Sequence, residues 1–269
     1  MTVDTRVLPA PTTDLDRAER DLAAHGICCV PDVLDAEQVA AIRLELDAAV
    51  EADQTSDEDR PSFGLDPDDS NQRVWNLPGR SPTFVELAEH PTALRLLRSV
   101  LGWPMLLGNL SGNITGPGGA AGTLHADQIF VPQPWPAEPQ GANAAWCIDD
   151  FTAANGATCF VPGSHLRNRL PEPGDDTGAV PYEAPAGSLV VFDSRLWHRT
   201  GANTTDTETT GDRQRAAVFG WYTRPIYRTQ ENWFLALDPS VAESASDELL
   251  VLLGYRTQGL GLVDGRSPR

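Results

Sequence analysis

The chain has 269 residues, an apolar content of 41% and a formal net charge of −18, which is enough for one large all-β or α+β domain. The negative charge argues against nucleic acid and anionic lipid as partners, because both require a basic surface. No apolar run approaches a membrane span and the N-terminus lacks a secretory signal pattern, so we expect a cytoplasmic protein without a membrane partner.

The first elements in chain order are a helix expected over 14–24, stopped by Gly26, and a short buried strand over 27–30. Two adjacent cysteines, Cys28 and Cys29, lie in that strand and would point to its opposite faces. The chain contains no CxxC pair. We therefore predict reduced core cysteines rather than a disulfide framework or a zinc site.

A second helix is predicted to start after Asp35, because Gln38 three residues on completes a capping pattern and apolar residues continue at helical spacing. Residues 52–72 are acidic, interrupted by proline and poor in apolar groups. An exposed loop is the simpler interpretation, and a mobile lid over a binding site is the alternative. A further helix is expected near 82–101.

From about Met105 onward the pattern changes to short β-rich segments separated by glycine and proline, which is typical of a sandwich or barrel. The strands are predicted over 105–110, 123–131, 144–149, 158–161, 188–192 and 215–223. We expect a mainly β fold in which the N-terminal helices pack on one sheet. A helix over 246–253 is expected to dock against it.

The domain organisation predicted from these elements is one domain over residues 1–269. Its parts are a helical N-terminal region, a β core and a C-terminal extension, with bounds of 1–104, 105–225 and 226–269. No repeat and no clear linker interrupts the chain.

The motif His125-Ala126-Asp127 follows a glycine-rich segment over 112–122. In a strand, residues i and i+2 face the same way, so both side chains would project together. His198 closes a later strand and turn. Two imidazoles and one carboxylate form the half-filled ligand shell that is diagnostic of non-heme Fe(II) oxygenases. The alternative is that His125 is a hydrogen-bonded core residue.

Arg215 opens an alternating strand on which Ala217, Phe219 and Trp221 share its face. A charged side chain inside the fold needs a partner, and the carboxylate of a bound 2-oxo acid would be one. The guanidinium offers a fixed two-pronged donor for such a group. Arg213 is the competing candidate, but its polar turn favours a position in solvent.

Taken in order, these motifs resemble the phytanoyl-CoA dioxygenase family. The matching segments are His125-x-Asp127, Asn155-Gly-Ala-Thr158, Val161-Pro-Gly-Ser-His165, Ala186-Gly-Ser-Leu-Val-Val-Phe192, His198 and Arg215-x-x-x-x-x-x-Tyr222. The resemblance runs from about Leu15 to Val263. It implies a double-stranded β-helix core (a jelly-roll, cupin-like fold) and an oxygenase that uses Fe(II), 2-oxoglutarate as cosubstrate and O2.

Carried onto this sequence, the resemblance implies an iron site formed by His125, Asp127 and His198. Relatives that halogenate lack this carboxylate, so Asp127 favours a halide-free outcome. We expect hydrogen abstraction that leads to hydroxylation or to ring closure, epimerisation or desaturation, with release of succinate and CO2.

For the cosubstrate, the resemblance implies that Arg215 holds the distal carboxylate of 2-oxoglutarate, assisted by the hydroxyl of Thr158. Arg73 matches a second arginine that contacts the cosubstrate in natural-product members. Many relatives place a glutamine three residues before the first histidine, where this chain has Gly122. We expect that hydrogen bond to be missing or supplied by another residue.

The predicted substrate pocket is lined by Trp75, Phe130, Trp135 and Trp221, with ordinary core positions as the alternative for each. An apolar secondary metabolite, a polyketide or terpenoid, is the expected substrate. The rival hypotheses are a non-oxidative double-stranded β-helix protein that uses the triad for binding, and a lyase or isomerase with another divalent metal. Arg215 beside an intact triad weighs against the first of these.

Overall fold

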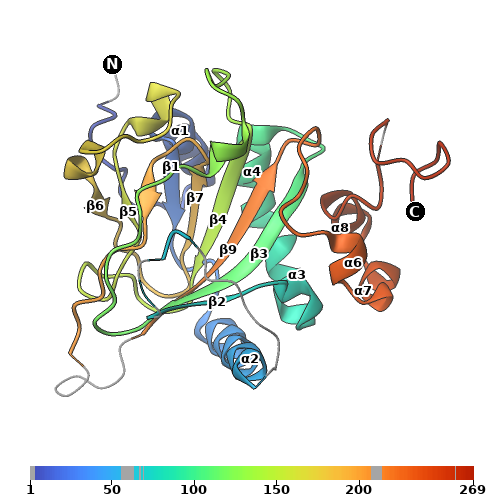
Figure 1. Ribbon diagram of the computed structural model, residues 1–269, viewed down its shortest axis with the longest axis horizontal. Helices are drawn as coiled ribbons and strands as arrows, with labels where there is room; N and C mark the ends of the chain where they lie inside the picture. Colours follow the sequence, from blue (N-terminus) through green and yellow to red (C-terminus); the bar gives the residue numbers. More distant parts are fainter. Residues whose placement is uncertain (1–3, 56–63, 67, 69, 207–213, 258) are drawn as a thin grey trace.

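The computed structural model describes residues 4–55, 64–66, 68, 70–206, 214–257 and 259–269, and two antiparallel sheets form its centre (Figure 1). The major sheet has the order β1 (Ile27–Val30), β7 (Leu189–Asp193), β4 (Gly141–Cys147), β9 (Arg215–Thr223), β3 (Leu106–Thr115) and β2 (Asn71–Val74). The minor sheet has the order β6 (Val180–Pro181), β5 (Cys159–Phe160) and β8 (His198–Arg199). An apolar cluster that includes Phe160 and Phe192 joins the sheets. The result is the predicted two-sheet core.

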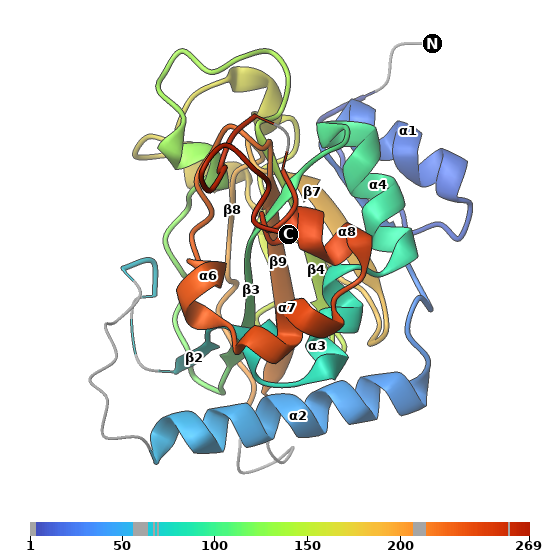
Figure 2. The same ribbon diagram turned by 90° about the vertical axis from the view of Figure 1, so that its right-hand side faces the viewer.

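The N-terminal helices cover the face of the major sheet that points away from the minor sheet, as their shared apolar cluster shows. They are α1 (Leu15–His25), α2 (Ala36–Gln54), α3 (Pro82–Ala88) and α4 (Pro91–Leu101), and Figure 2 shows α2 crossing the base of the molecule. Both predicted helix starts and the stop at Gly26 are confirmed. Asp14 caps α1, Gly26 ends it in the left-handed conformation with φ 72°, and Asp35 and Gln38 form the capping box of α2.

The C-terminal extension packs beside β3 through three short helices, α6 (Trp233–Ala236), α7 (Pro239–Ser244) and α8 (Asp247–Leu252). The indole Nε1 of Trp233 donates a hydrogen bond to the Leu107 carbonyl at 2.7 Å, which fixes the start of the extension on the sheet. The helix predicted over 246–253 is confirmed as α8. Across the ranges that the structure describes, no helix has the length and apolarity to cross a membrane.

Four short 3-10 turns complete the described elements: Leu77–Gly79, Asp127–Phe130, Ser164–Arg167 and Asp175–Gly178. The second of these overturns the strand predicted over 123–131, because Asp127 starts a turn and only His125 makes a β-bridge. The helix predicted near 82–101 is two helices, since Pro91 cannot continue a helix and His90 caps the next one.

Boundaries around β3, β2 and α2 also differ from the prediction. Strand β3 extends through Thr115, so the first four residues of the expected glycine-rich segment belong to the sheet, and β2 pairs with them. Residues 71–72 of the predicted acidic loop belong to strand β2, and residues 52–54 belong to helix α2. Within the rest of that loop, residues 56–63, 67 and 69 lie outside the described residues, and so does Arg213.

Side-chain alternation on β1 assigns the adjacent cysteines to different clusters. Cys28 packs with the helices, whereas Cys29 packs between the sheets. All four cysteines are free thiols, and Cys159 is the only one that is not fully buried. The prediction of reduced core cysteines is confirmed.

Candidate metal centre and adjoining cavity

The two histidines of the motif lie directly opposite each other in an antiparallel bridge. The amide of His125 donates to the His198 carbonyl at 3.0 Å, and the amide of His198 donates to the His125 carbonyl at 2.9 Å. Opposed residues in such a pair project from the same face, so the imidazole centroids come within 4.3 Å. Asp127 lies two residues further on and is the first residue of a 3-10 turn, from which its side chain joins the two imidazoles.

Backbone carbonyls fix which ring nitrogen of each histidine faces the carboxylate. Nδ1 of His125 lies 2.8 Å from the Thr123 carbonyl, and Nδ1 of His198 lies 2.9 Å from the Leu196 carbonyl. Because a carbonyl only accepts, each Nδ1 carries the proton and each Nε2 keeps its lone pair. Both Nε2 atoms lie 3.4 Å from an Asp127 carboxylate oxygen.

These three side chains can hold a metal ion, since their ligand atoms all lie within 4.8 Å of one another. Burial raises the pKa of the Asp127 carboxyl, but the neighbouring imidazoles outweigh it and hold the pKa well below its usual range. Burial lowers the pKa of His198, and the Asp127 carboxylate more than reverses this shift. The Asp127 carboxylate is therefore ionised, which suits the cluster to a cation.

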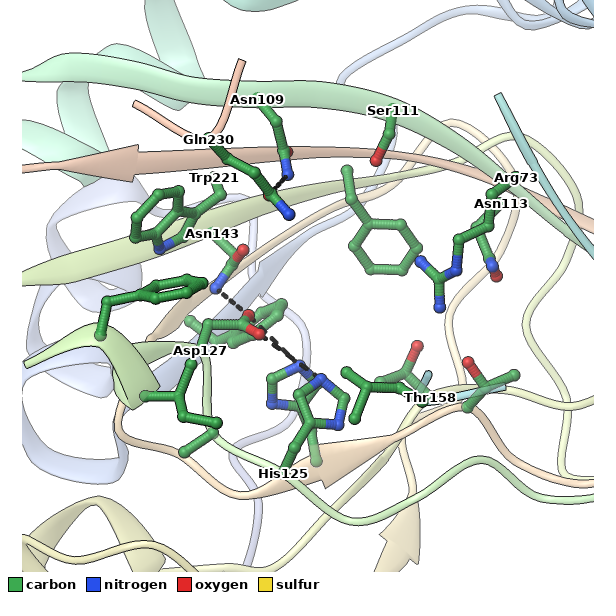
Figure 3. Close-up of a pocket in the computed structure, with 18 of the residues that line it drawn as sticks. Arg73, Asn109, Ser111, Asn113, His125, Asp127, Asn143, Thr158, Trp221 and Gln230 are labelled. Carbon is green, nitrogen blue, oxygen red and sulfur yellow. Dashed lines mark hydrogen bonds and ion pairs between the residues drawn. The ribbon is translucent and has the colours of Figure 1, made fainter. Parts of the chain in front are cut away.

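Asn143 on β4 orients the carboxylate, and sequence reasoning did not identify it. Its Nδ2 donates to Asp127 Oδ2 at 2.9 Å (Figure 3). The same Nδ2 lies 3.4 Å from the Ser194 hydroxyl. The side chain is buried in a strand whose neighbours are small and apolar. The sequence pattern that could have identified Asn143 was a single amide side chain in an otherwise apolar strand, because a buried amide requires hydrogen-bonding partners.

Arg215 is completely buried at the start of β9, and its guanidinium is only partly satisfied. One amino group, Nη2, donates to the Thr115 hydroxyl at 2.9 Å, and the guanidinium carbon lies 4.9 Å from the centre of the Phe151 ring. Within the described ranges, Nε and Nη1 have no hydrogen-bond partner. Burial lowers the pKa of Arg215 to about 10, so it remains a cation at neutral pH. A buried cation with donors that remain free can bind the carboxylate of a ligand.

The other two predicted cosubstrate residues, Thr158 and Arg73, line one cavity with the metal cluster. Its volume is about 190 Å³. Arg73 is also held by Asp66, whose carboxylate lies 2.7 Å from its Nε. Arg215 lies behind this lining, next to Thr115 at the end of β3.

Three of the four predicted pocket aromatics, Trp75, Phe130 and Trp221, line the same cavity. The Phe130 and Trp221 rings are 6.1 Å apart, centre to centre. The structure does not bring Trp135 to the cavity. Its indole donates to the Val131 carbonyl at 3.0 Å, and the ring packs in a separate apolar cluster.

Gly122 lies beside the cavity wall without being crowded. Its amide donates to the carbonyl of Thr200, a cavity residue, at 2.9 Å. A Cβ built at Gly122 would find its nearest neighbour, the Leu65 carbonyl oxygen, at 3.4 Å, which is ordinary contact. Among the described residues, the backbone therefore leaves room for a Cβ at this position.

A row of polar residues on β3 forms one wall of the cavity and was not predicted. Asn109, Ser111 and Asn113 alternate along the strand and all line the cavity (Figure 3). Asn109 donates to the side chain of Gln230 from the C-terminal extension. The alternation of polar residues at every second position could have predicted this wall, but much of the segment was assigned to a glycine-rich loop.

Two imidazoles, one carboxylate and a buried arginine with free donors are what non-heme Fe(II) oxygenases with a 2-oxo acid cosubstrate require. The chain belongs to the phytanoyl-CoA dioxygenase (PhyH) family, whose model matches residues 22–210. The enzyme uses iron, 2-oxoglutarate and O2, as the motifs implied.

Relatives and solved structures agree with this assignment. The chain is 35% identical over 256 residues to a protein named dioxygenase af480 from Aspergillus fumigatus, covering 92% of this chain and 81% of that one. The non-heme alpha ketoglutarate dependent epimerase SnoN from nogalamycin biosynthesis aligns at 26% identity with a TM-score of 0.62, over 82% and 88% of the two chains. HygX from Streptomyces hygroscopicus, with nickel, 2-oxoglutarate and hygromycin B bound, shares the fold at 18% identity with a TM-score of 0.63, over 79% and 88%. The predicted jelly-roll class is confirmed.

Proposed function

We propose that this enzyme oxidises a small secondary metabolite, a largely apolar polyketide or terpenoid, by hydrogen abstraction. Hydroxylation, ring closure, epimerisation or desaturation would follow. The observation that carries the proposal is Arg215, a buried cation with two donors that have no partner in the described ranges, in a fold that also holds a cluster of potential metal ligands. Such a group costs stability unless a ligand supplies the missing carboxylate.

In this proposal Fe(II) is held by Nε2 of His125, Nε2 of His198 and one carboxylate oxygen of Asp127. The carbonyls at Nδ1 of both histidines lock the rings, and Asn143 holds the second oxygen of the carboxylate. Three protein ligands leave coordination positions for cosubstrate and O2. With 2-oxoglutarate and O2, bound iron supplies the oxidant that removes a hydrogen atom, and succinate and CO2 are released.

The same proposal assigns the cosubstrate to the remaining cavity residues. Arg215 would bind the distal carboxylate, with the hydroxyls of Thr115 and Thr158 nearby and Arg73 at the cavity wall. Trp75, Phe130 and Trp221 would shape the space for the substrate and keep water away from the reacting carbon. Trp135 would then stabilise the loop that follows the metal motif.

The halide-free outcome follows from the carboxylate of Asp127, which occupies the position that a halide would need. A solved neighbour at 26% identity is an epimerase, and another neighbour of the same fold is a carbocyclase. Both outcomes begin with hydrogen removal, so they belong within the proposed reaction class. We also propose that residues 1–269 act as one domain, because the extension supplies Gln230 to the cavity.

The test is an anaerobic titration of the protein with Fe(II) and 2-oxoglutarate. We expect a weak visible charge-transfer band, lost in Arg215→Ala and retained in Arg256→Ala, which removes an exposed arginine paired with Asp247. Admission of O2 should then consume 2-oxoglutarate. If the wild-type protein forms no band and never consumes 2-oxoglutarate, the proposed function is wrong.

A further inference from the structure

A second chamber of about 630 Å³ adjoins the metal cavity. The two share Asp127, Phe130, Trp221 and Gln230, so the chamber opens beside the metal cluster. Much of its remaining wall comes from residues 223–232, where β9 leads into the C-terminal extension. A molecule larger than the metal cavity can therefore occupy both spaces.

The boundary between the two chambers is held in place by hydrogen bonds. The indole of Trp221 donates to the Ser194 hydroxyl at 3.1 Å, which fixes the ring that faces Phe130. Asn109 on β3 bonds Gln230, which ties the extension across the boundary (Figure 3). A fixed boundary separates the part of a substrate that reacts from the part that is only held.

Gln128, the residue after the metal ligand, gives the outer chamber its chemical character. Its Oε1 accepts from the Gln140 amide at 2.9 Å, and since that amide only donates, the orientation of the side-chain amide is settled. Its Nε2 is therefore a donor. It is buried on a side chain that is 2% exposed, and it has no acceptor within the described ranges. A buried donor without an acceptor is stabilised by an oxygen atom of a bound molecule.

Other side chains of this wall also offer donors. In the described part of the chain, neither the amide of Asn232 nor the guanidinium of Arg228 makes a hydrogen bond or ion pair, and Asn232 does not cap α6. The one carboxylate among the described wall residues is Asp127, which is engaged at the metal cluster. The wall thus favours oxygen acceptors, and it offers an ammonium group no free carboxylate.

We propose that the outer chamber binds the part of the substrate remote from the oxidised carbon, and that this part is an oxygen-bearing ring system without an amine. Its carbonyl, ether or hydroxyl oxygen accepts the hydrogen bond of Gln128 Nε2, while Phe130 and Trp221 contact the ring face. The inference rests on the proposed function, because it assumes that the reacting carbon lies in the metal cavity.

Three bicyclic probes of one shape test the chamber in the metal-free protein by saturation-transfer NMR. They are the ketone 1-tetralone, the hydrocarbon tetralin and the ammonium compound 1-aminotetralin. We expect 1-tetralone to bind about three- to tenfold more tightly than the other two, as one net hydrogen bond allows. Failure of 1-tetralone to bind at its solubility limit, or equal binding of the amine, overturns the proposal.

Gln128→Glu tests whether Gln128 causes the preference for 1-tetralone, because it keeps the acceptor for the Gln140 backbone amide and removes the donor. It should weaken 1-tetralone about three- to tenfold and strengthen 1-aminotetralin. The matched control Gln133→Glu adds the same charge at an exposed position outside both chambers and should change neither. If Gln128→Glu fails to fold, Asn232→Leu serves in its place, because the Asn232 side chain makes no hydrogen bond to another described residue.

The two levels of the argument fail separately. A wild-type protein that forms the Fe(II) and 2-oxoglutarate band but shows no preference among the probes overturns the outer chamber alone. A protein that prefers the ketone, loses this preference in Gln128→Glu and forms no band supports the chamber and overturns the proposed function.

Discussion

The two faces of the major sheet are built from the same strands but have opposite energetic character. On β9, Val218 and Tyr222 point to the helices, where they are fully buried and the Tyr222 hydroxyl donates to the Ala88 carbonyl at 2.7 Å. Arg215 and Trp221 point to the space between the sheets, where two donors of Arg215 have no partner among the described residues. One face is satisfied by the fold itself, and we propose that ligands complete the other.

Strand β3 shows how local backbone geometry sets this division. The pairing with β9 shifts between Leu107 and Asn109, and this irregularity turns Asn109 toward the cavity. A Cβ at the intervening Gly108 would lie 2.0 Å from the Trp221 ring, so only glycine lets the indole pass there. The irregularity and the glycine together place Trp221 against the polar wall of the cavity.

The largest expected effect comes from the ligand-dependent face. His198→Ala should weaken Fe(II) binding by more than about 100-fold, because it removes a metal ligand rather than a supporting residue. Isothermal titration under anaerobic conditions measures the affinity. His25→Ala, at the end of α1, is the control and should leave it unchanged. Retained affinity in His198→Ala would remove this residue from the metal site.

Arg215→Met tests the comparison most directly, because it should raise stability and weaken 2-oxoglutarate binding together. Loss of an unpaired buried cation should stabilise the ligand-free protein by about 1–3 kcal/mol, whereas 2-oxoglutarate binding should weaken about 100-fold. Thermal unfolding with and without 2-oxoglutarate measures both effects. A less stable variant that still binds 2-oxoglutarate would show that Arg215 belongs to the fold.

A second buried arginine provides the control for that experiment. Arg195 is 6% exposed, and its Nη2 lies 2.7 Å from the Asp193 carboxylate. Arg195→Met leaves that carboxylate unpaired and should destabilise the protein by about 3 kcal/mol. The two arginines should therefore respond with opposite signs.

The sequence predicted the features that depend on local pattern. The cap at Asp35 follows from side-chain chemistry, and β9 was predicted to the residue because its alternation is regular. The His125 and Asp127 pair was predicted for a strand, whereas the side chains meet across a bridge and a turn. Asn143 and Gln230 were missed, because hydrogen bonds across the fold bring them to the site and no local spacing reports such contacts.

On the satisfied face, Val218→Ala should lower the free energy of unfolding by about 2 kcal/mol through the cavity it leaves. The affinity for 2-oxoglutarate should stay the same, since the side chain points away from the ligand face. Urea denaturation and titration of the Fe(II)-loaded protein with 2-oxoglutarate measure the two quantities. The matched substitution on the opposite face of β9 is Phe219→Leu, at the next residue, which lines the metal cavity. A binding defect in Val218→Ala would show that the two faces are coupled.

The smallest effect is expected at Asn143, which acts on the metal only through Asp127. Asn143→Leu removes the donor to Oδ2 at similar volume, and Fe(II) affinity should fall about 10-fold. With Oδ2 free to swing toward the ion, the visible spectrum of the Co(II)-substituted protein should also change, which simple loss of packing would not produce. Ser111→Ala alters the same cavity without touching Asp127 and should leave the spectrum unchanged. An unchanged Co(II) spectrum in Asn143→Leu would reduce Asn143 to a packing residue, and the orientation of Asp127 would then depend on the backbone at its turn.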